Sequence, residues 1–412
     1  MWIASSLEHH YDRFRTIWTM LRGNKPVWPQ FTQRLAWKLR PYFLRHPLPH
    51  DIACWRLRDA NADDIDQMTR VETENSSWWK FLTPFFAAHG YHLYAPFVEL
   101  LSDYSHPLPL DGHPSSRQTH PFARRLYSAN KDCKFFFKNC IRGARDAYGR
   151  DVVIRIVSGP ERSRELEILK RLTSSPALKD PRNITIPILD WLEFDGLTFI
   201  VMPRWDPAWI HDFGTVAECI HITDSFLAYL DFLHQHRIAH MDIHAGNMCI
   251  NTIVPSFYSH LTGLRNPAVT RYAMIDFGVS YIYPYDMPLE TVREELPIYA
   301  WAFHGLEDEK GPFNPFCADV GALGTVLDRH VRVIRDVVPE IVPFIESMTT
   351  PRPDDRPTAH EAYLKFQALK ASLTSEQLQA PVTDLSYRGD GHYQRKYVYK
   401  KRPQLPDPDW SP

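Results

Sequence analysis

Apolar and polar residues alternate along the middle of the chain in a way that predicts strands followed by helices. Residues 151–157 (DVVIRIV) are a β-branched run of strand length, and residues 161–172 (ERSRELEILKRL) repeat apolar side chains at helical spacing. Residues 197–203 (LTFIVMP) predict a second buried strand, and residues 215–237 place their apolar side chains on one face of a long helix. This helix leads directly into the segment HMDIHAGN (240–247).

The two ends of the chain follow other patterns. Up to about residue 120 the sequence is rich in Trp, His and Pro, and residues 11–22 and 76–94 predict short helices packed by aromatic side chains. Residues 106–121 (HPLPLDGHPSSRQTHP) predict a loop that separates this region from the rest. After about residue 380 the proline-rich sequence predicts a poorly ordered tail.

Composition narrows the class of protein. With 412 residues and 44% hydrophobic residues, the chain can bury a large core. Its 47 basic and 49 acidic residues nearly balance, so charge gives no reason to expect nucleic-acid or membrane partners. The six cysteines lack CxxC pairs, and no apolar run is long enough for a membrane span. We therefore expect an intracellular protein, cytoplasmic or nuclear.

Two short segments contain the residues with the clearest chemistry. In HMDIHAGN the carboxylate of Asp242 comes five residues before Asn247, and MIDFG (274–278) places Asp276 after an apolar run. Transfer of a γ-phosphate needs a carboxylate near the acceptor hydroxyl and oxygen ligands for Mg²⁺. The pattern predicts Asp242, Asn247 and Asp276 as catalytic residues, with Asn247 and Asp276 as the metal ligands.

These segments resemble the eukaryotic protein kinases. Their H-R-D-x-x-x-x-N and D-F-G motifs recur here as residues 240–242 with Asn247 and as residues 276–278. The resemblance spans about residues 125–370. Within the family, the chain most resembles the divergent protein-kinase-like proteins of mushroom-forming fungi. It implies an α+β, bilobal protein-kinase-like fold with an N-terminal helical and aromatic extension. The implied ranges are 1–121 for the extension and linker, 122–372 for the kinase-like domain (N-lobe 122–203, hinge 203–205, C-lobe 206–372) and 373–412 for the tail.

The resemblance also implies a nucleotide site that uses ATP and Mg²⁺. Arg155 stands where the family has its phosphate-pairing lysine, and Glu165 matches the glutamate that pairs with it. Met202 matches the gatekeeper. The Pro203 carbonyl and the Trp205 amide would meet the adenine edge.

Further matches follow in the C-terminal half. Asp319 in ADVGALG matches the aspartate that braces the catalytic loop, and Arg356 matches an arginine that usually pairs with a glutamate, for which Glu307 is the candidate. His240, Phe277 and Leu169 match the stacked apolar spine of the family.

Several positions depart from the family pattern. The stretch 134–146 (KFFFKNCIRGARD), aligned with the glycine-rich loop, has phenylalanines where a backbone should approach phosphates. Arg155 replaces the lysine, and His244 replaces the lysine two residues after the catalytic acid. Met241 replaces an arginine that would receive a phosphate on the activation segment. The candidate acceptors there are Ser280, Tyr281, Tyr283 and Thr291.

The favoured function is therefore a divergent protein kinase that transfers phosphate from ATP to a protein hydroxyl, and two alternatives stay open. A catalytically impaired pseudokinase scaffold would explain the departures. A small-molecule kinase would explain the string HxDIHxGN, which resembles aminoglycoside and choline kinases. A metal site is a further, less favoured interpretation of the histidine-rich stretch at 234–244.

Overall fold

The computed structural model describes most of the chain as two compact units. The described residues are 27–43, 48–55, 65–96, 104–106, 120–125, 135–136, 140–209, 212–253, 264–295, 311–382, 385–387 and 393–395. The first unit contains residues up to 115, 134–161 and 189–202, and the second contains 116–133, 162–188 and everything from 203. The chain crosses from the first unit to the second between Met202 and Pro203, at the start of the stretch that the resemblance assigns to the hinge.

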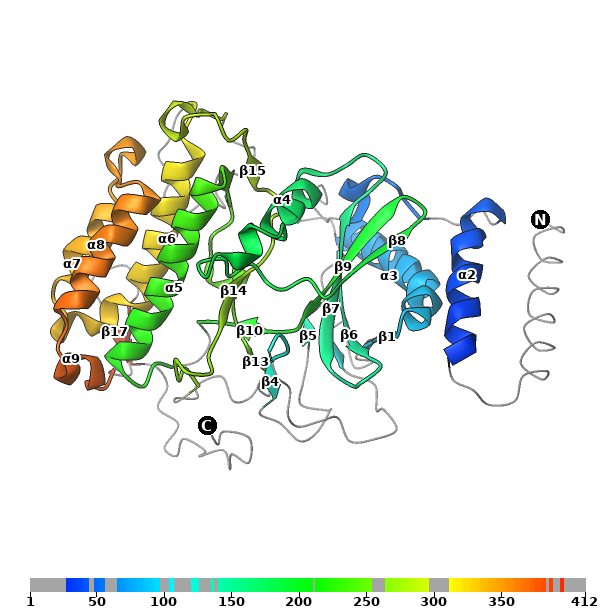
Figure 1. Cartoon of the computed structure of the whole chain (residues 1–412), viewed down its shortest axis with the longest axis horizontal. Helices are drawn as coiled ribbons and strands as arrows, with labels where there is room; N and C mark the ends of the chain where they lie inside the picture. The colour runs from blue at the N-terminus through cyan, green and yellow to red at the C-terminus, as the bar shows by residue number, and fades with distance from the viewer. Residues whose placement is uncertain are drawn as a thin grey trace. The chain divides into compact units, whose positions relative to one another are not determined.

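A five-stranded sheet forms the centre of the first unit (Figure 1). Its strands, in spatial order, are β1 (Tyr91–Leu93), β6 (Ile141–Asp146), β7 (Asp151–Ser158), β9 (Leu197–Pro203) and β8 (Asp190–Phe194). Every residue of β7 is buried, as its β-branched run predicts. The predicted strands at 151–157 and 197–203 are therefore confirmed.

Aromatic side chains of the N-terminal region complete the core of this unit. Helix α3 (Ile65–Ala88) contributes Trp79 and Phe86, whose rings contact the ring of Phe199 on β9 at centroid distances of 6.2 and 5.3 Å. Helix α2 (Val27–Phe43) packs against α3, and the 3₁₀ turn η1 (Ile52–Trp55) buries Trp55. Helices α2 and α3 and the turn η1 are thus part of the first unit.

The same region also supplies a strand that the sequence analysis missed. The stretch 76–94 was expected to be helical, but α3 ends at Ala88 and the chain then forms β1, which pairs antiparallel with β6. Strand β1 is only three residues long, and its partner lies about fifty residues later. No local pattern could have indicated that pairing.

The connection from β1 to β6 corrects the alignment of the glycine-rich loop. Residues 94–140 form this connection, and within it β2 (Ala95–Pro96), β3 (Tyr104–His106) and β5 (Phe135–Phe136) make a separate three-stranded sheet. Strand β5 pairs with β3, not with β6. Phe135 and Phe136 therefore do not lie in a tight hairpin turn between two strands of the five-stranded sheet. The connection between β1 and β6 is instead the long segment 94–140, called the excursion below.

Helices dominate the second unit, and α5, α6, α7 and α8 lie side by side in it (Figure 1). The helices are α4 (Arg164–Leu172), α5 (Val216–Gln235), α6 (Pro315–His330), α7 (Ile341–Met348), α8 (Ala359–Ser372) and α9 (Ser375–Gln379). The 3₁₀ turns are η3 (Ala177–Lys179), η4 (Ala245–Asn247), η5 (Leu289–Thr291), η7 (Arg332–Asp336) and η8 (Pro353–Asp355). The helices predicted at 161–172 and 215–237 correspond to α4 and α5, so both predictions are confirmed.

Short strands connect these helices. Strands β10 (Asp206–Pro207), β12 (Met248–Ile250) and β14 (Tyr272–Met274) form one sheet, and β11 (Ile238–Ala239) pairs with β15 (Tyr281–Ile282). Strand β4 (Arg124–Arg125) pairs with β13 (Thr252–Ile253), and β16 (Leu385–Tyr387) pairs with β17 (Tyr393–Arg395). A unit that combines a five-stranded sheet with helices α2 and α3, and a larger helical unit, together make the kinase-like α+β fold that the sequence predicts.

The start of the C-terminal tail belongs to the helical unit. Helix α9 begins with a capping box at Thr374 and Gln377, and the side chain of Gln377 donates to the carbonyl of Val337. The backbone of Val382 donates to Gly214. Residues 374–382, at the start of the range 373–412 predicted as the tail, are therefore folded. None of the described helices combines the length and the apolar character needed to cross a membrane.

Candidate active site

Asp242 and Asn247 form one hydrogen-bonded pair on the loop after α5. The Nδ2 atom of Asn247 donates to the backbone oxygen of Asp242 at 2.9 Å and to its Oδ2 atom at 2.8 Å. Asn247 is buried and ends the 3₁₀ turn η4, which brings it back toward Asp242. Two of the three predicted catalytic side chains are thus in direct contact.

Asp319, on helix α6, holds this loop by its backbone. Its Oδ2 atom accepts the N–H of His240 at 2.6 Å, and its Oδ1 atom accepts the N–H of Met241 at 2.8 Å. Met241 has a φ of 63°, a conformation that a non-glycine residue adopts only when its surroundings enforce it. The buried carboxylate of Asp319 therefore braces the loop, in the way the resemblance implies.

His240 connects the loop to the segment that contains Asp276. Its Nδ1 atom accepts the N–H of Asp242 at 3.2 Å, so the neutral ring carries its proton on Nε2, which lies 3.1 Å from the carbonyl oxygen of Ile275. The ring also contacts the ring of Phe277 at 5.0 Å between centroids. These contacts fix Asp276, between Ile275 and Phe277, relative to the loop.

Asp276 itself is held in an uncommon backbone conformation. Its φ is 67°, and its Oδ1 atom accepts the N–H of Gly278 at 3.2 Å. The N–H of Ile275 donates to the carbonyl of Asn247 at 3.0 Å, which joins this segment to the end of the loop at 240–247. All three predicted catalytic residues are therefore held in one hydrogen-bonded framework within the helical unit.

Opposing influences act on the Asp242 carboxyl, whose side chain is 29% exposed. Burial raises its pKa and the negative charge of Asp276 does the same, but the neighbouring imidazoles of His244 and His240 outweigh them and hold the pKa of Asp242 below its usual range. Asp242 is therefore ionised at neutral pH, as an acceptor of a hydroxyl proton must be.

The donor atoms present fit Mg²⁺. Because the Nδ2 atom of Asn247 is bound to Asp242, the amide oxygen is the atom that Asn247 can offer to a cation, and Asp276 offers a carboxylate. Mg²⁺ takes oxygen ligands and usually keeps several waters, so one carboxylate and one amide suffice with phosphate oxygens.

The histidines of the stretch 234–244 serve other contacts. In the described part of the chain, no three or more His, Cys, Asp and Glu side chains are grouped so that they could hold a metal ion. His234 lies 3.3 Å from Asp319, and His236 lies 2.9 Å from the carbonyl oxygen of Phe232. A histidine metal site is therefore not supported.

The predicted nucleotide-binding residues are divided between the two units. In the first unit, Arg155 on β7 is buried, with its Nη1 atom 3.8 Å from Sγ of Cys140, and Met202 is buried at the end of β9. In the second unit, Glu165 is buried in the first turn of α4, which Ser163 caps by accepting the N–H of Leu166.

The hinge residue Trp205 has a partner that the sequence did not indicate. Its indole Nε1 atom donates to the carbonyl oxygen of Pro121 at 2.9 Å, and the ring of His120 lies 6.2 Å away. The same segment continues into β4, which pairs in parallel with β13 just after the catalytic loop. Part of the excursion between β1 and β6 thus lies against the predicted hinge and belongs to the helical unit.

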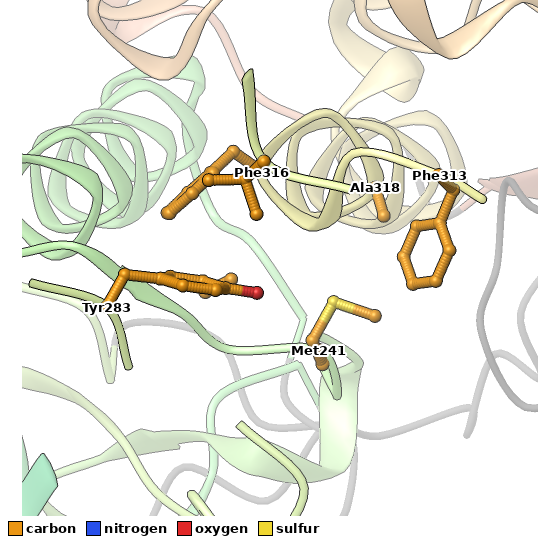
Figure 2. Packing of buried hydrophobic residues seen from close by; sticks show 7 residues of the cluster. Met241, Tyr283, Phe313, Phe316 and Ala318 are labelled. Atoms are coloured by element: carbon orange, nitrogen blue, oxygen red, sulfur yellow. The ribbon is translucent and has the colours of Figure 1, made fainter. Parts of the chain in front are cut away.

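Met241 belongs to a buried apolar cluster that also contains Tyr283 and Val292 of the segment that follows Asp276. Figure 2 shows its side chain between Tyr283, Phe316 and Phe313. The other buried members are Ala239, Val292 and Ala318, with Val279, Tyr281, Met287 and Leu289 packed against them. Protein kinases have an arginine at this position of the motif, whereas here an apolar side chain packs with the segment that follows Asp276.

Two of the four candidate phosphate acceptors on that segment are used internally. The hydroxyl of Ser280 is buried and donates to the carbonyl of His240 at 2.7 Å, and the hydroxyl of Tyr283 donates to Glu294 at 2.7 Å. Tyr281 stacks under the guanidinium of Arg164, 4.6 Å from its ring centroid. Phosphorylation of Ser280 or Tyr283 would require the packed segment to open.

Arg356 fastens the end of the kinase-like region. Its Nε atom donates to the carbonyl of Thr350 at 2.9 Å and its Nη1 atom to that of Cys317 at 3.2 Å. Glu307, the predicted partner of Arg356, lies outside the described residues.

Comparison with known proteins adds a structural likeness. The sequence matches no family model, and no curated protein matches it. Many solved structures match the fold, among them the crystal structure of the Rad53 kinase domain and SCD2. That match is 16% identical, with a TM-score of 0.39, and covers 59% of this chain and 92% of the other. The resemblance to the fungal subgroup stays a prediction.

Proposed function

We propose that this chain is an ATP-dependent phosphotransferase of the protein-kinase type, which transfers phosphate to a hydroxyl group of a protein. The observation that supports it best is the hydrogen-bonded pair of Asp242 and Asn247. The side-chain amide of Asn247 donates to both the backbone oxygen and the carboxylate of Asp242. A buried aspartate, Asp319, holds the same loop by two backbone amides. Such bracing pre-positions a carboxylate for proton acceptance.

Each residue has a distinct role in this proposal. Asp242 accepts the proton of the acceptor hydroxyl, and Asn247 holds its backbone oxygen and its Oδ2 atom in place. Asn247 and Asp276 would hold Mg²⁺, which would neutralise charge on the phosphates. The nucleotide-binding roles proposed for Arg155 and Glu165 rest on the sequence resemblance. Met202, the Pro203 carbonyl and the Trp205 amide border the adenine.

A second candidate function, a pseudokinase scaffold, has its own supporting observations. Residues 94–140 replace the tight turn whose backbone would cradle phosphates. Arg155 is a planar, forked cation close to Cys140, and it cannot reproduce the compact ammonium of a lysine. In this case the fold would bind partners without transferring phosphate.

The decisive experiment measures nucleotide binding and transfer on the purified full chain. ATP and Mg²⁺ added together should raise the unfolding midpoint more than either alone, because a ligand that binds only the folded state stabilises it. Transfer from labelled ATP should fall about a thousandfold in Asp242→Asn, within the range for loss of a general base. Asp224→Asn on α5, whose carboxylate pairs with Lys370 at 2.6 Å, is the matched control.

The outcomes separate the candidates. No midpoint shift at millimolar nucleotide would favour the scaffold, and undiminished transfer by Asp242→Asn would exclude the mechanism. Preferential use of aminoglycosides or choline over protein acceptors would favour the small-molecule kinase.

A further inference from the structure

The ring of His244 is held in a defined orientation by the backbone of its own loop. His244 is the residue before the 3₁₀ turn η4, and its Nδ1 atom accepts the N–H of Gly246 at 3.0 Å. A ring nitrogen that accepts a hydrogen bond carries no proton. The neutral imidazole must therefore carry its proton on Nε2.

That Nε2 atom faces the acid of the site. It lies 3.7 Å from Oδ1 of Asp242, while Oδ2 of the same carboxylate accepts the amide of Asn247 at 2.8 Å. The separation is slightly longer than a hydrogen bond, and contacts of this kind commonly shorten when substrate enters. Each carboxylate oxygen of Asp242 thus faces a different side chain: Oδ1 faces His244 and Oδ2 accepts from Asn247.

Gly246 provides the room for this arrangement. A Cβ atom at position 246 would come within 2.8 Å of Cε1 and 3.0 Å of Nδ1 of His244, closer than ordinary van der Waals contact allows. Any larger residue would push the ring from its place. Gly246 therefore contributes to the orientation of His244 both by its small size and by its backbone N–H.

We propose that His244 is a positioning residue for phosphoryl transfer: its neutral ring, fixed at Nδ1 by the Gly246 amide, directs Nε2–H onto Oδ1 of Asp242. A lysine, which the protein-kinase family has at this position, offers three donors and no acceptor, so it could not accept the Gly246 amide. This inference rests on the proposed function and specifies how its acid is oriented.

Two substitutions separate the two nitrogen atoms of the ring. In His244→Asn the side-chain oxygen can still accept the Gly246 N–H, but the donor toward Asp242 is lost. In His244→Gln the longer amide can reach Asp242 with an N–H, but the acceptor for Gly246 is lost. The control is His360→Asn, which removes a histidine that lies 3.3 Å from a different aspartate, Asp231.

The experiment measures kcat and KM for transfer from labelled ATP with the full chain and its variants. We expect His244→Asn to lower kcat about ten- to a hundredfold, as losses of orienting partners commonly do, with KM for ATP nearly unchanged. His244→Gln should recover part of kcat, because it restores the donor toward Asp242 but not the bond to Gly246, and His360→Asn should match the parent chain. Thermal unfolding of each variant reports any loss of folding.

The possible failures are distinguishable. An active parent chain whose kcat survives His244→Asn, or falls equally in His244→Gln, would overturn the positioning role and leave the proposed function standing. A parent chain with no transfer to any acceptor would refute the proposed function itself, and the inference with it.

Discussion

The carboxylate of Asp319 accepts the backbone N–H of His240 at 2.6 Å, although 79 positions separate the two residues in the chain. Its second oxygen accepts the next amide, that of Met241. We expect Asp319→Asn to lower the free energy of unfolding by about 2–4 kcal/mol. The NH₂ group of asparagine would face one of the two backbone N–H groups, which would then be buried without an acceptor. Urea unfolding measures the change.

Asp328 on the same helix is the control for this experiment. It pairs with Arg332 at 2.7 Å near the surface, so Asp328→Asn should cost no more than about 1 kcal/mol. Equal effects of the two substitutions would show that Asp319 has no special bracing role.

The cluster around Met241 predicts that arginine, the residue of protein kinases at this position of the motif, would be destabilising here. Met241→Arg would bury a cation among the rings of Tyr283 and Phe316, and we expect a loss of about 2–5 kcal/mol of stability together with faster proteolysis near residues 279–295. Met241→Leu keeps an apolar side chain of similar size and should cost less than about 1.5 kcal/mol. A stable, protease-resistant Met241→Arg chain would contradict the hydrophobic attachment of the segment.

Local patterns predicted the parts of this molecule that depend on neighbouring residues. The periodicities of α4 and α5 and the β-branched run of β7 are statements about single elements, and the structure confirms them. Asp242 and Asn247 are five residues apart, so their contact also follows from a short segment.

Other features depend on residues far apart, where local patterns are silent. The pairing of β1 with β6 joins distant stretches through backbone groups that any residue could supply. The indole of Trp205 donates to a backbone carbonyl 84 positions away, which is likewise an acceptor that any residue could supply. The orientation of His244 depends on a side chain accepting an amide two residues later. The signal was present in the string HAGN, since glycine leaves space beside a ring, but only the structure shows the direction of Nε2.

His221 on α5 makes stability depend on pH. Burial lowers its pKa from the ordinary value of 6.5, and the charges of Lys370, Arg271 and Arg265 add to this, while Asp224 opposes it. Its Nδ1 atom is buried without a hydrogen-bond partner among the described residues, and its ring packs on Tyr272.

Because the folded pKa of His221 lies below the unfolded one, the unfolded chain binds more protons as pH falls below about 6.5. Stability should therefore decrease on acidification from pH 7 to pH 5.5, with at most about 1 kcal/mol per pH unit from this ring. Urea unfolding should show a flatter slope against pH for His221→Gln. His360→Gln, at an exposed ring, should keep the parent slope, and identical slopes for both variants would rule out His221 as the source.

Arg155 offers a test of how far the nucleotide site has departed from the protein-kinase pattern. The side chain is buried, and its Nη1 atom lies 3.8 Å from Sγ of Cys140. A lysine has a compact ammonium that can approach a phosphate more closely than the planar guanidinium can. We expect Arg155→Lys to tighten binding of Mg²⁺·ATP about tenfold, equivalent to about 1.4 kcal/mol, and Arg155→Met to abolish it. Isothermal titration measures both.

Arg150→Lys is the matched control, because Arg150 directly precedes the same strand, β7, and pairs with Asp146 at 2.6 Å. If Arg155→Lys binds no better than Arg150→Lys, the arginine is not what limits nucleotide affinity, and the excursion at 94–140 becomes the part of the chain to change next.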